Sequence, residues 1–346
     1  MLLGEAKSLT RAWVEAQAPA LGGYQGSLMT GSAIWQPDDE ELWPTSDVDV
    51  RLVLDEPLPP VKLGKVRHQG VLLDVTYLSS REVRSPEDVL GSFYLAGSFS
   101  RPSILHDPRG RLQALTDAAA PEYRRRHWIR KRCEHGWSNA ARHFGALSGA
   151  LPLHDQATIW LFGTAAATIV LLGAGLRNPT VRTRYLAVRH LLADYRLLDE
   201  YEPLLAALGC ARMGRRDVER HLAALEAVFD AAARVVRSPF FFASDVSADA
   251  RPIAIDGSRD LIERGFHREA IFWIAATFAR CDKILYHDAP PLVRDEQLGA
   301  FLALLDDLGV GSTADLLERV GQAEEQSPRL WELADAIMAA NPEVRD

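Results

Sequence analysis

Three aspartates in the first quarter of the chain have the types and spacing that metal chemistry requires. Residues 47–54 (DVDVRLVL) and 71–77 (VLLDVTY) both alternate apolar and polar side chains. Because positions i and i+2 of a strand point to the same face, Asp47 and Asp49 project together, and a neighbouring strand can add Asp74. Clustered carboxylates suit Mg²⁺, and two such ions about 3.5–4 Å apart can clamp an in-line phosphoryl displacement. The three aspartates therefore predict a magnesium site.

Two further features favour a metal site over the simplest alternative, in which the aspartates of an amphipathic strand merely face solvent. Asp is depleted in strands, so Asp47 and Asp49 opposite a fully apolar face favour a functional role. Upstream stand Gly31 and Ser32. Glycine lets a phosphate approach the backbone, and N–H groups with a serine hydroxyl can hold phosphate oxygens. Arg51 shares the face of the two aspartates, where it can pair with them or with a phosphate.

Together these segments resemble the signature of the DNA polymerase β-like nucleotidyltransferases. That signature is an apolar strand, Gly-Ser, a short linker, Ser-Asp-x-Asp and a third acidic residue on a later strand. Here GYQGSLMTGSAIW precedes SDVDV, and Asp74 in GVLLDVTYLS matches the third acid. The segment ILHDPRGRLQAL is similar to the family's exit from the catalytic sheet, so the resemblance covers about residues 20–118. One departure is Trp35-Gln36-Pro37, where the family commonly has a glycine.

The resemblance implies an Mg²⁺-dependent enzyme that moves a nucleoside monophosphate from an NTP, expected to be ATP, to a hydroxyl of a small-molecule acceptor, releasing pyrophosphate. Asp47 and Asp49 would bind two metal ions. Asp74 would bind the catalytic ion and could accept the acceptor's proton. Gly31, Ser32 and Arg51 would contact the nucleotide.

The acceptor is less defined than the reaction. A single chain with a catalytic domain first and helices after it resembles the antibiotic nucleotidyltransferases, which implies an aminoglycoside-like acceptor. The acidic loop 38–41 (DDEE) would suit such a cationic molecule, or it is only a solvated turn. The alternative is a regulatory or antitoxin-like nucleotidyltransferase module that acts on or binds a protein partner.

A basic run, residues 124–132 (RRRHWIRKR), follows the predicted catalytic domain. Arg130 and Lys131 are candidates for the nucleotide's phosphates. Glu134 lies one helical turn beyond Arg130, and resemblance to kanamycin nucleotidyltransferase-like enzymes makes it a candidate base. For each of the three, an exposed helical residue is the simpler interpretation.

The periodicities predict an α+β protein: a small mixed β-sheet domain over 1–118, then an all-α domain over 119–346, with a possible subdivision near 238–256. The resemblance implies that the first is the nucleotidyltransferase catalytic domain and that the second binds the acceptor. Strands are expected at 24–35, 47–54 and 71–77 and around SILHDPRG, and helices at 5–19 and 86–95. After residue 120 only helices are expected, at 121–147, 155–173, 180–195, 198–208, 214–237, 258–284, 294–308, 312–320 and 328–340.

Composition and local sequence patterns argue against several classes of partner, location and metal site. A net charge of −8 argues against a nucleic-acid-binding protein. No apolar run reaches the roughly 20 residues of a membrane span, and 159–172 is expected to be a buried helix. The N-terminus lacks the pattern of a signal peptide, so a cytoplasmic location is expected. Cys133, Cys210 and Cys281 are isolated, and no histidine spacing supports zinc.

Overall fold

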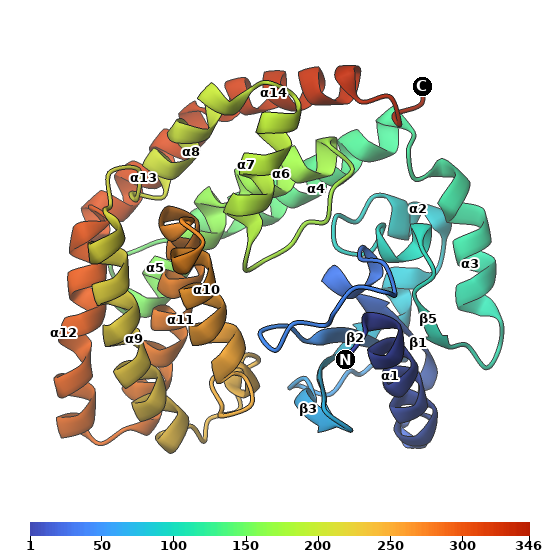
Figure 1. Ribbon diagram of the computed structural model, residues 1–346, viewed down its shortest axis with the longest axis horizontal. Coiled ribbons are helices and arrows are strands. Elements are labelled where there is room, and N and C mark those ends of the chain that lie inside the picture. Colours follow the sequence, from blue (N-terminus) through green and yellow to red (C-terminus); the bar gives the residue numbers. More distant parts are fainter. The chain divides into compact units, whose positions relative to one another are not determined.

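The computed structural model describes residues 1–346 as fourteen α-helices and five β-strands joined by turns and short helical segments (Figure 1). Its contacts divide the chain into two compact units. Unit 1 comprises Met1–His135, Phe240–Asp245 and Glu343–Asp346, and unit 2 comprises Gly136–Pro239 and Val246–Pro342. The sheet belongs to unit 1 and unit 2 is helical, so the predicted α+β class is confirmed.

The division at residue 135 lies beyond the change of composition near residue 118. Helix α4 (Arg126–Phe144) crosses it, because the first turns of α4 pack in unit 1. There the buried Arg132 guanidinium donates to the carbonyl oxygens of Leu90, at 3.2 Å, and Tyr123, at 2.8 Å. The segment near 238–256, which the sequence marks as a possible separator, also contributes to both units.

The sheet has the strand order β3-β4-β2-β1-β5. Strands β2 and β4 are parallel, and the other neighbours are antiparallel. The strands are β1 (Tyr24–Thr30), β2 (Val48–Leu54), β3 (Gly64–His68), β4 (Val71–Ser79) and β5 (Ile104–His106). Four of them match predicted strands, with β1 ending at the Gly31 turn, but β3 was not predicted.

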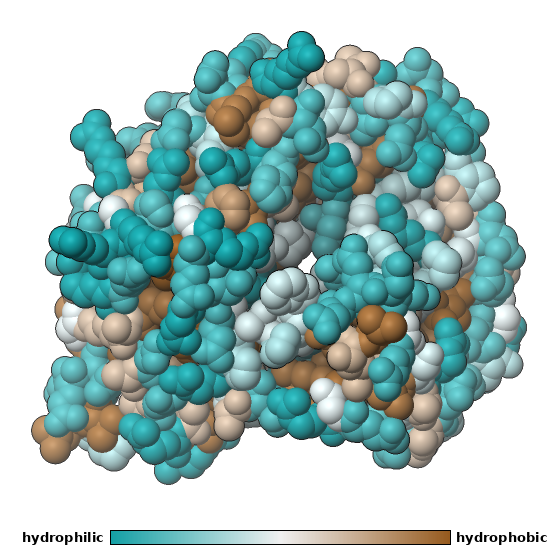
Figure 2. All heavy atoms as spheres, in the orientation of Figure 1, coloured by the Kyte–Doolittle hydropathy of each residue, from teal (hydrophilic) through white to brown (hydrophobic).

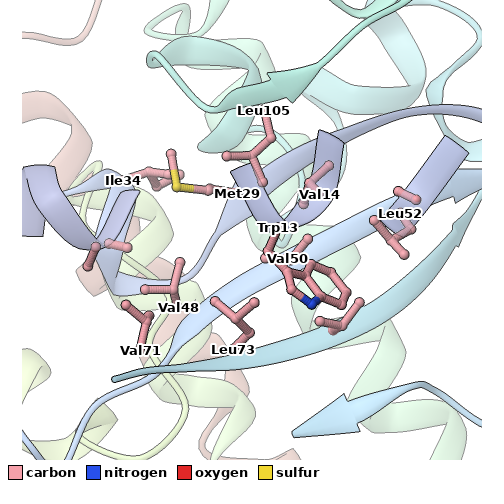
Figure 3. Packing of buried hydrophobic residues seen from close by; sticks show 14 of the residues in the cluster. Trp13, Val14, Met29, Ile34, Val48, Val50, Leu52, Val71, Leu73 and Leu105 are labelled. Carbon is pink, nitrogen blue, oxygen red and sulfur yellow. The ribbon is translucent and has the colours of Figure 1, made fainter. Parts of the chain in front are cut away.

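One face of the sheet is the core of unit 1. Helix α1 (Leu3–Gln17) packs Trp13 and Val14 against it, and Val50 of β2 and Leu73 of β4 point from the sheet toward the same region (Figure 3). The period-2 pattern explains this face, because every second side chain of β2 and β4 is apolar and points the same way. The opposite face carries Asp49 and Asp74.

Two short helices complete unit 1. Helix α2 (Pro86–Leu90) is shorter than the predicted 86–95, and helix α3 (Arg111–Ala119) was not predicted. Ser85 begins α2 with a capping box, in which its hydroxyl accepts from the Asp88 N–H.

Unit 2 contains helices at every predicted position, but two of the predicted helices are split. The stretch 155–173 forms α5 and α6, which are interrupted at Ala165, and 258–284 forms α10 and α11, which are separated by Gly265 at φ +87°. The helices are α5 (Leu153–Thr164), α6 (Ala166–Ala174), α7 (Arg184–Asp194), α8 (Tyr201–Ala207), α9 (Arg215–Val235), α10 (Gly257–Glu263), α11 (His267–Asp288), α12 (Pro291–Asp307), α13 (Thr313–Glu325) and α14 (Ser327–Ala340).

Residues Leu153–Ala174 form one helical stretch that is long and apolar enough to cross a membrane. Most of this stretch is buried inside the protein, as in the core helix of a soluble protein. The predicted burial of 159–172 is therefore confirmed, although Ala165 divides the segment between α5 and α6. Hydrophilic side chains, in teal, cover most of the visible face in Figure 2. The three cysteines are buried, and none of them forms a disulfide.

Candidate metal centre

The three predicted aspartates lie together on the polar face of the sheet. Asp47 immediately precedes β2, Asp49 is its second residue, and Asp74 is directly opposite Asp49 in the parallel register of β2 and β4. One carboxylate oxygen from each residue lies within 4.8 Å of the others, and all three residues are partly buried. Parallel pairing of two alternating strands is thus sufficient to assemble the cluster.

Two lysines that sequence reasoning missed enter the same cluster. Lys65 lies on β3 directly opposite Asp74, and its side chain is only 7% exposed. Its ammonium group donates to Asp47 and lies 3.0 Å from Asp74 Oδ2. The ammonium group of Lys62, which is equally buried, donates to both oxygens of Asp74 at 2.9 and 3.1 Å. Neither lysine donates to Asp49.

A fourth carboxylate comes from far along the chain. Segment Phe240–Asp245 belongs to unit 1, and Asp245 accepts a hydrogen bond from Lys62 at 3.0 Å. The same oxygen, Oδ1, lies 3.9 Å from the Lys65 ammonium. Ser244 lies against Gly64 so closely that a Cβ atom at Gly64 would be 2.3 Å from the serine hydroxyl. The segment is therefore fitted to the edge strand at the site.

The surroundings of Asp49 and Asp74 shift their pKa values in opposite directions. Burial, together with the charges of Asp47 and Asp74, raises the pKa of Asp49 to about 7, although Lys65 and Arg51 partly offset the rise. Burial would also raise the pKa of Asp74, but the charges and hydrogen bonds of Lys65 and Lys62 outweigh it and hold that pKa below its ordinary value. Asp49 is thus the carboxylate whose charge lacks compensation when no metal ion is bound.

The Gly31 turn lies directly beside Asp49. Gly31 has φ +65° and ψ −155°, a conformation almost confined to glycine. A Cβ atom there would lie 1.7 Å from Asp49 Oδ2. Glycine at this position therefore makes room for the carboxylate as well as for close approach to the backbone. Ser32 follows as the first residue of a short 3₁₀ turn.

The Trp35-Gln36-Pro37 departure has a structural role of its own. Trp35 ends the 3₁₀ turn by donating its N–H to the Ser32 carbonyl oxygen at 2.9 Å. The Arg101 guanidinium stacks over the Trp35 ring, with its carbon 3.4 Å from the ring centroid. Stacking of this kind fixes the ring on the turn, where a glycine would provide no contact.

The remaining predicted residues differ in their relation to the cluster. Arg51 lies on the face of Asp49, and its charge acts on that carboxylate. Arg130 and Glu134 form an i,i+4 ion pair at 3.2 Å on α4, with both side chains substantially exposed. Lys131 lies over the Trp128 ring at 4.5 Å. These contacts of Arg130, Lys131 and Glu134 lie outside the carboxylate cluster and are those of ordinary exposed helical residues.

The first arginines of the basic run form ion pairs with residues of the C-terminal segment. Arg124 pairs with Glu343 at 3.0 Å, and Arg126 pairs with Asp346 at 2.8 Å. The Arg126 N–H also donates to the Arg345 carbonyl oxygen at 2.8 Å. Part of this run therefore serves the chain's own C-terminal segment.

The acidic loop 38–41 has a local structural function. The N–H groups of Leu3 and Gly4, in the first turn of α1, donate to the carbonyl oxygens of Glu40 and Asp38 at 2.8 and 2.9 Å. Lys7 pairs with the Asp38 carboxylate at 2.6 Å. The loop thus supplies acceptors that the start of a helix needs, and its charge suits the positive end of the helix dipole.

The raised pKa of Asp49 predicts how the metal-free protein responds to pH. Between its ordinary value of 3.8 and about 7, the folded protein retains a proton on Asp49 that the unfolded chain has lost. Stability in EDTA should therefore fall as pH rises through this window and level off above it. The lowered pKa of Asp74 acts below 3.8 and leaves the window unaffected.

Denaturant unfolding of the wild type and an Asp49→Asn variant, measured in EDTA from pH 5 to 8, tests this expectation. The variant lacks the titrating group, so its stability should fall less over the same range. Parallel pH profiles for the two proteins would contradict the assigned titration.

A scan of the chain against protein-family models finds no match, and a search of curated proteins finds none. The carboxylate cluster, its lysines and the adjoining glycine turn therefore carry the functional interpretation.

Proposed function

We propose that this chain is a metal-dependent nucleotidyltransferase. It would move a nucleoside monophosphate from an NTP, expected to be ATP, to a hydroxyl of a small-molecule acceptor and release pyrophosphate. The observation that carries the proposal is the meeting of Asp47, Asp49 and Asp74 on adjacent strands beside the Gly31 turn. A cytoplasmic location and an aminoglycoside-like acceptor belong to the same proposal, and rest on composition and resemblance alone.

The residues present fit Mg²⁺. All the ligand atoms that the cluster offers are carboxylate oxygens, which are the hard ligands that this ion prefers. Burial and the charges of Asp47 and Asp74 raise the pKa of Asp49, so this carboxylate gains most from a nearby cation. Asp47 and Asp49 would hold two ions, and Asp74 would hold one of them. When bound, such ions neutralise charge on the reacting phosphate and orient it for in-line attack.

The chain's own residues would bind and orient the nucleotide. The Gly31 backbone allows a phosphate to approach closely, and the Ser32 hydroxyl and N–H groups of the turn can donate to its oxygens. Arg51, on the same face as Asp49, can add a charged, two-pronged donor. A group that removes the proton of the acceptor hydroxyl must come within about 2.6–3.2 Å of it.

Asp74 and Glu134 are the two candidates for that proton acceptor. Two lysines hold the pKa of Asp74 low, which makes it a weak base while those contacts persist. Glu134 is exposed and paired with Arg130. We therefore assign Asp74 first as a metal ligand.

The deciding experiment incubates the protein with each NTP, Mg²⁺ and a panel of hydroxyl-bearing antibiotics, and reads product masses. Expected is an acceptor heavier by one nucleotidyl group, which is the nucleoside monophosphate less one water, together with released pyrophosphate, only when a divalent ion is present. A mass gain on this protein or on a protein partner instead would replace the small-molecule acceptor with the regulatory alternative. Absence of any transfer and of any nucleotide binding would contradict the proposal.

An Asp74→Asn variant should separate the ligand role of Asp74 from a role as base. With Mg²⁺, turnover should fall by about 10²–10⁴. If Asp74 is a ligand, Mn²⁺ should restore part of the turnover, because this ion binds nitrogen and oxygen ligands more readily. Initial rates and nucleotide affinity, measured in both metals, provide the test. Restored nucleotide binding without turnover would reassign Asp74 as the base.

A further inference from the structure

Lys65 holds two of the three carboxylates that a metal ion would need. Its ammonium group donates to Asp47, lies 3.0 Å from Asp74, and is nearly enclosed, at 7% exposure. A divalent cation on the same oxygens would compete for their lone pairs and repel the ammonium charge. A metal ion on these oxygens would therefore displace Lys65 from at least one of these contacts.

Asp245 provides an alternative partner for the displaced group. Its Oδ1 atom lies 3.9 Å from the Lys65 ammonium, which is already within ion-pair distance. Asp245 does not belong to the group of aspartates whose oxygens converge. Because the Lys65 side chain is long and flexible, a small rotation suffices to exchange Asp47 for Asp245.

Lys62 is the natural comparison because it is similarly buried and shares the partner Asp74 with Lys65. It donates to both oxygens of Asp74 and to Asp245, but it makes no contact with Asp47. It also lies 5.3 Å from the centroid of the Phe241 ring, so it is fixed within the Phe240–Asp245 segment. Lys62 can therefore keep its Asp245 contact when a cation binds at Asp47 and Asp49.

We propose that Lys65 is a displaceable counter-ion of the metal centre. It pairs with Asp47 and Asp74 in the metal-free protein and moves to Asp245 when a divalent ion binds, which makes Asp245 a positioning residue. The exchange breaks the Lys65–Asp47 ion pair and forms a full Lys65–Asp245 pair, with no change of net charge in the protein. The inference rests on the proposed function, because it takes the divalent ion from it.

Titration of the full-length protein with Mn²⁺ alone, followed by calorimetry, tests the exchange without any reference to turnover. Lys65→Gln keeps a hydrogen-bond donor but removes the charge that repels a cation, and should bind Mn²⁺ more tightly than the wild type, by about tenfold or more. Lys65→Arg keeps the charge and should not tighten binding. Lys62→Gln removes an equal charge from the same cluster, and its gain should be clearly smaller.

Asp245→Asn should act in the opposite direction, weakening Mn²⁺ binding because Lys65 loses the partner to which it moves. In a Lys65→Gln background the same change should have much less effect, which a double-mutant cycle measures. These Asp245 variants keep the inference testable even if Lys65→Gln does not fold.

Equal gains for Lys65→Gln and Lys62→Gln would overturn the inference in favour of a general charge effect. Additive effects of Lys65→Gln and Asp245→Asn would overturn it as well. A wild type that binds Mn²⁺ with the expected variant pattern, yet transfers no nucleotide, would contradict only the proposed function. A wild type and variants that all fail to bind Mn²⁺ would contradict both.

Discussion

An Asp49→Asn variant is expected to lose metal-dependent nucleotidyl transfer by about 10³-fold or more, because a metal ligand contributes several kcal/mol to the transition state. The stability of this variant should not fall along with its activity. The Asp49 charge is unfavourable in the metal-free fold, as its raised pKa indicates, so an uncharged amide of the same shape should leave stability equal or higher at pH 8. Initial rates with Mg²⁺ and unfolding in EDTA measure the two effects.

Asp55→Asn is the matched control for this variant. Asp55 directly follows β2, at its far end from Asp49, and accepts hydrogen bonds from Gln25 at 2.6 Å and Ser80 at 2.8 Å. It lies outside the converging carboxylates, so its variant should transfer nucleotides at a rate near that of the wild type. Transfer by Asp49→Asn within a few-fold of Asp55→Asn would remove Asp49 from the metal centre.

The cluster itself was predictable because it depends on local periodicity. The alternation in 47–54 and 71–77 determines which face of each strand carries Asp47, Asp49 and Asp74. Once the two strands pair, the apolar faces must share the core with α1, and the aspartates then meet on the other face. Register follows from burial, since a shift by one residue would bury the carboxylates.

Lys65 was missed because strand β3 was missed, and Lys62 lies two residues before that strand. Its hairpin with β4 closes through Gln69 and Gly70, both at positive φ, which is the geometry of a two-residue turn in a tight hairpin. The signal in the sequence is a Gln-Gly pair between two short runs, and recognising it would have placed Lys65 opposite Asp74. Pro57, Pro59 and Pro60, which precede β3, favour a loop rather than a strand.

The contribution of Asp245 was beyond sequence reasoning. It stands 183 residues from Lys62, its ion-pair partner, in a segment without strand or helix periodicity. No spacing rule connects residues so far apart, because their proximity depends on how the whole chain returns to unit 1. For Arg130, Lys131 and Glu134 the roles stay predictions, because exposed helix surfaces also carry basic runs and the contacts of these residues are local to α4.

Replacing Gly31 with alanine is expected to impair both metal binding and nucleotidyl transfer, although Gly31 is not itself one of the carboxylate ligands. The backbone conformation of Gly31 should cost an alanine about 1–3 kcal/mol of stability. The new Cβ would also lie 1.7 Å from Asp49 Oδ2, so the Asp49 side chain must move. A displacement of about 1 Å at a catalytic group can cost about 10²-fold in rate. Calorimetric Mn²⁺ affinity and Mg²⁺-dependent rates should both fall.

Gly110→Ala is a control for alanine at a positive φ without a steric clash, although its ψ of 12° makes the strain milder than at Gly31. Gly110 has nearly the same φ, +67°, but a Cβ atom there would meet nothing within 4 Å. This control should lose some stability and retain both metal affinity and transfer. Because Asp49 Oδ2 is the atom displaced, metal affinity should fall in Gly31→Ala even without nucleotide. If metal affinity is preserved and only nucleotide affinity falls, Gly31 serves the phosphates alone, and its contact with Asp49 has no functional consequence.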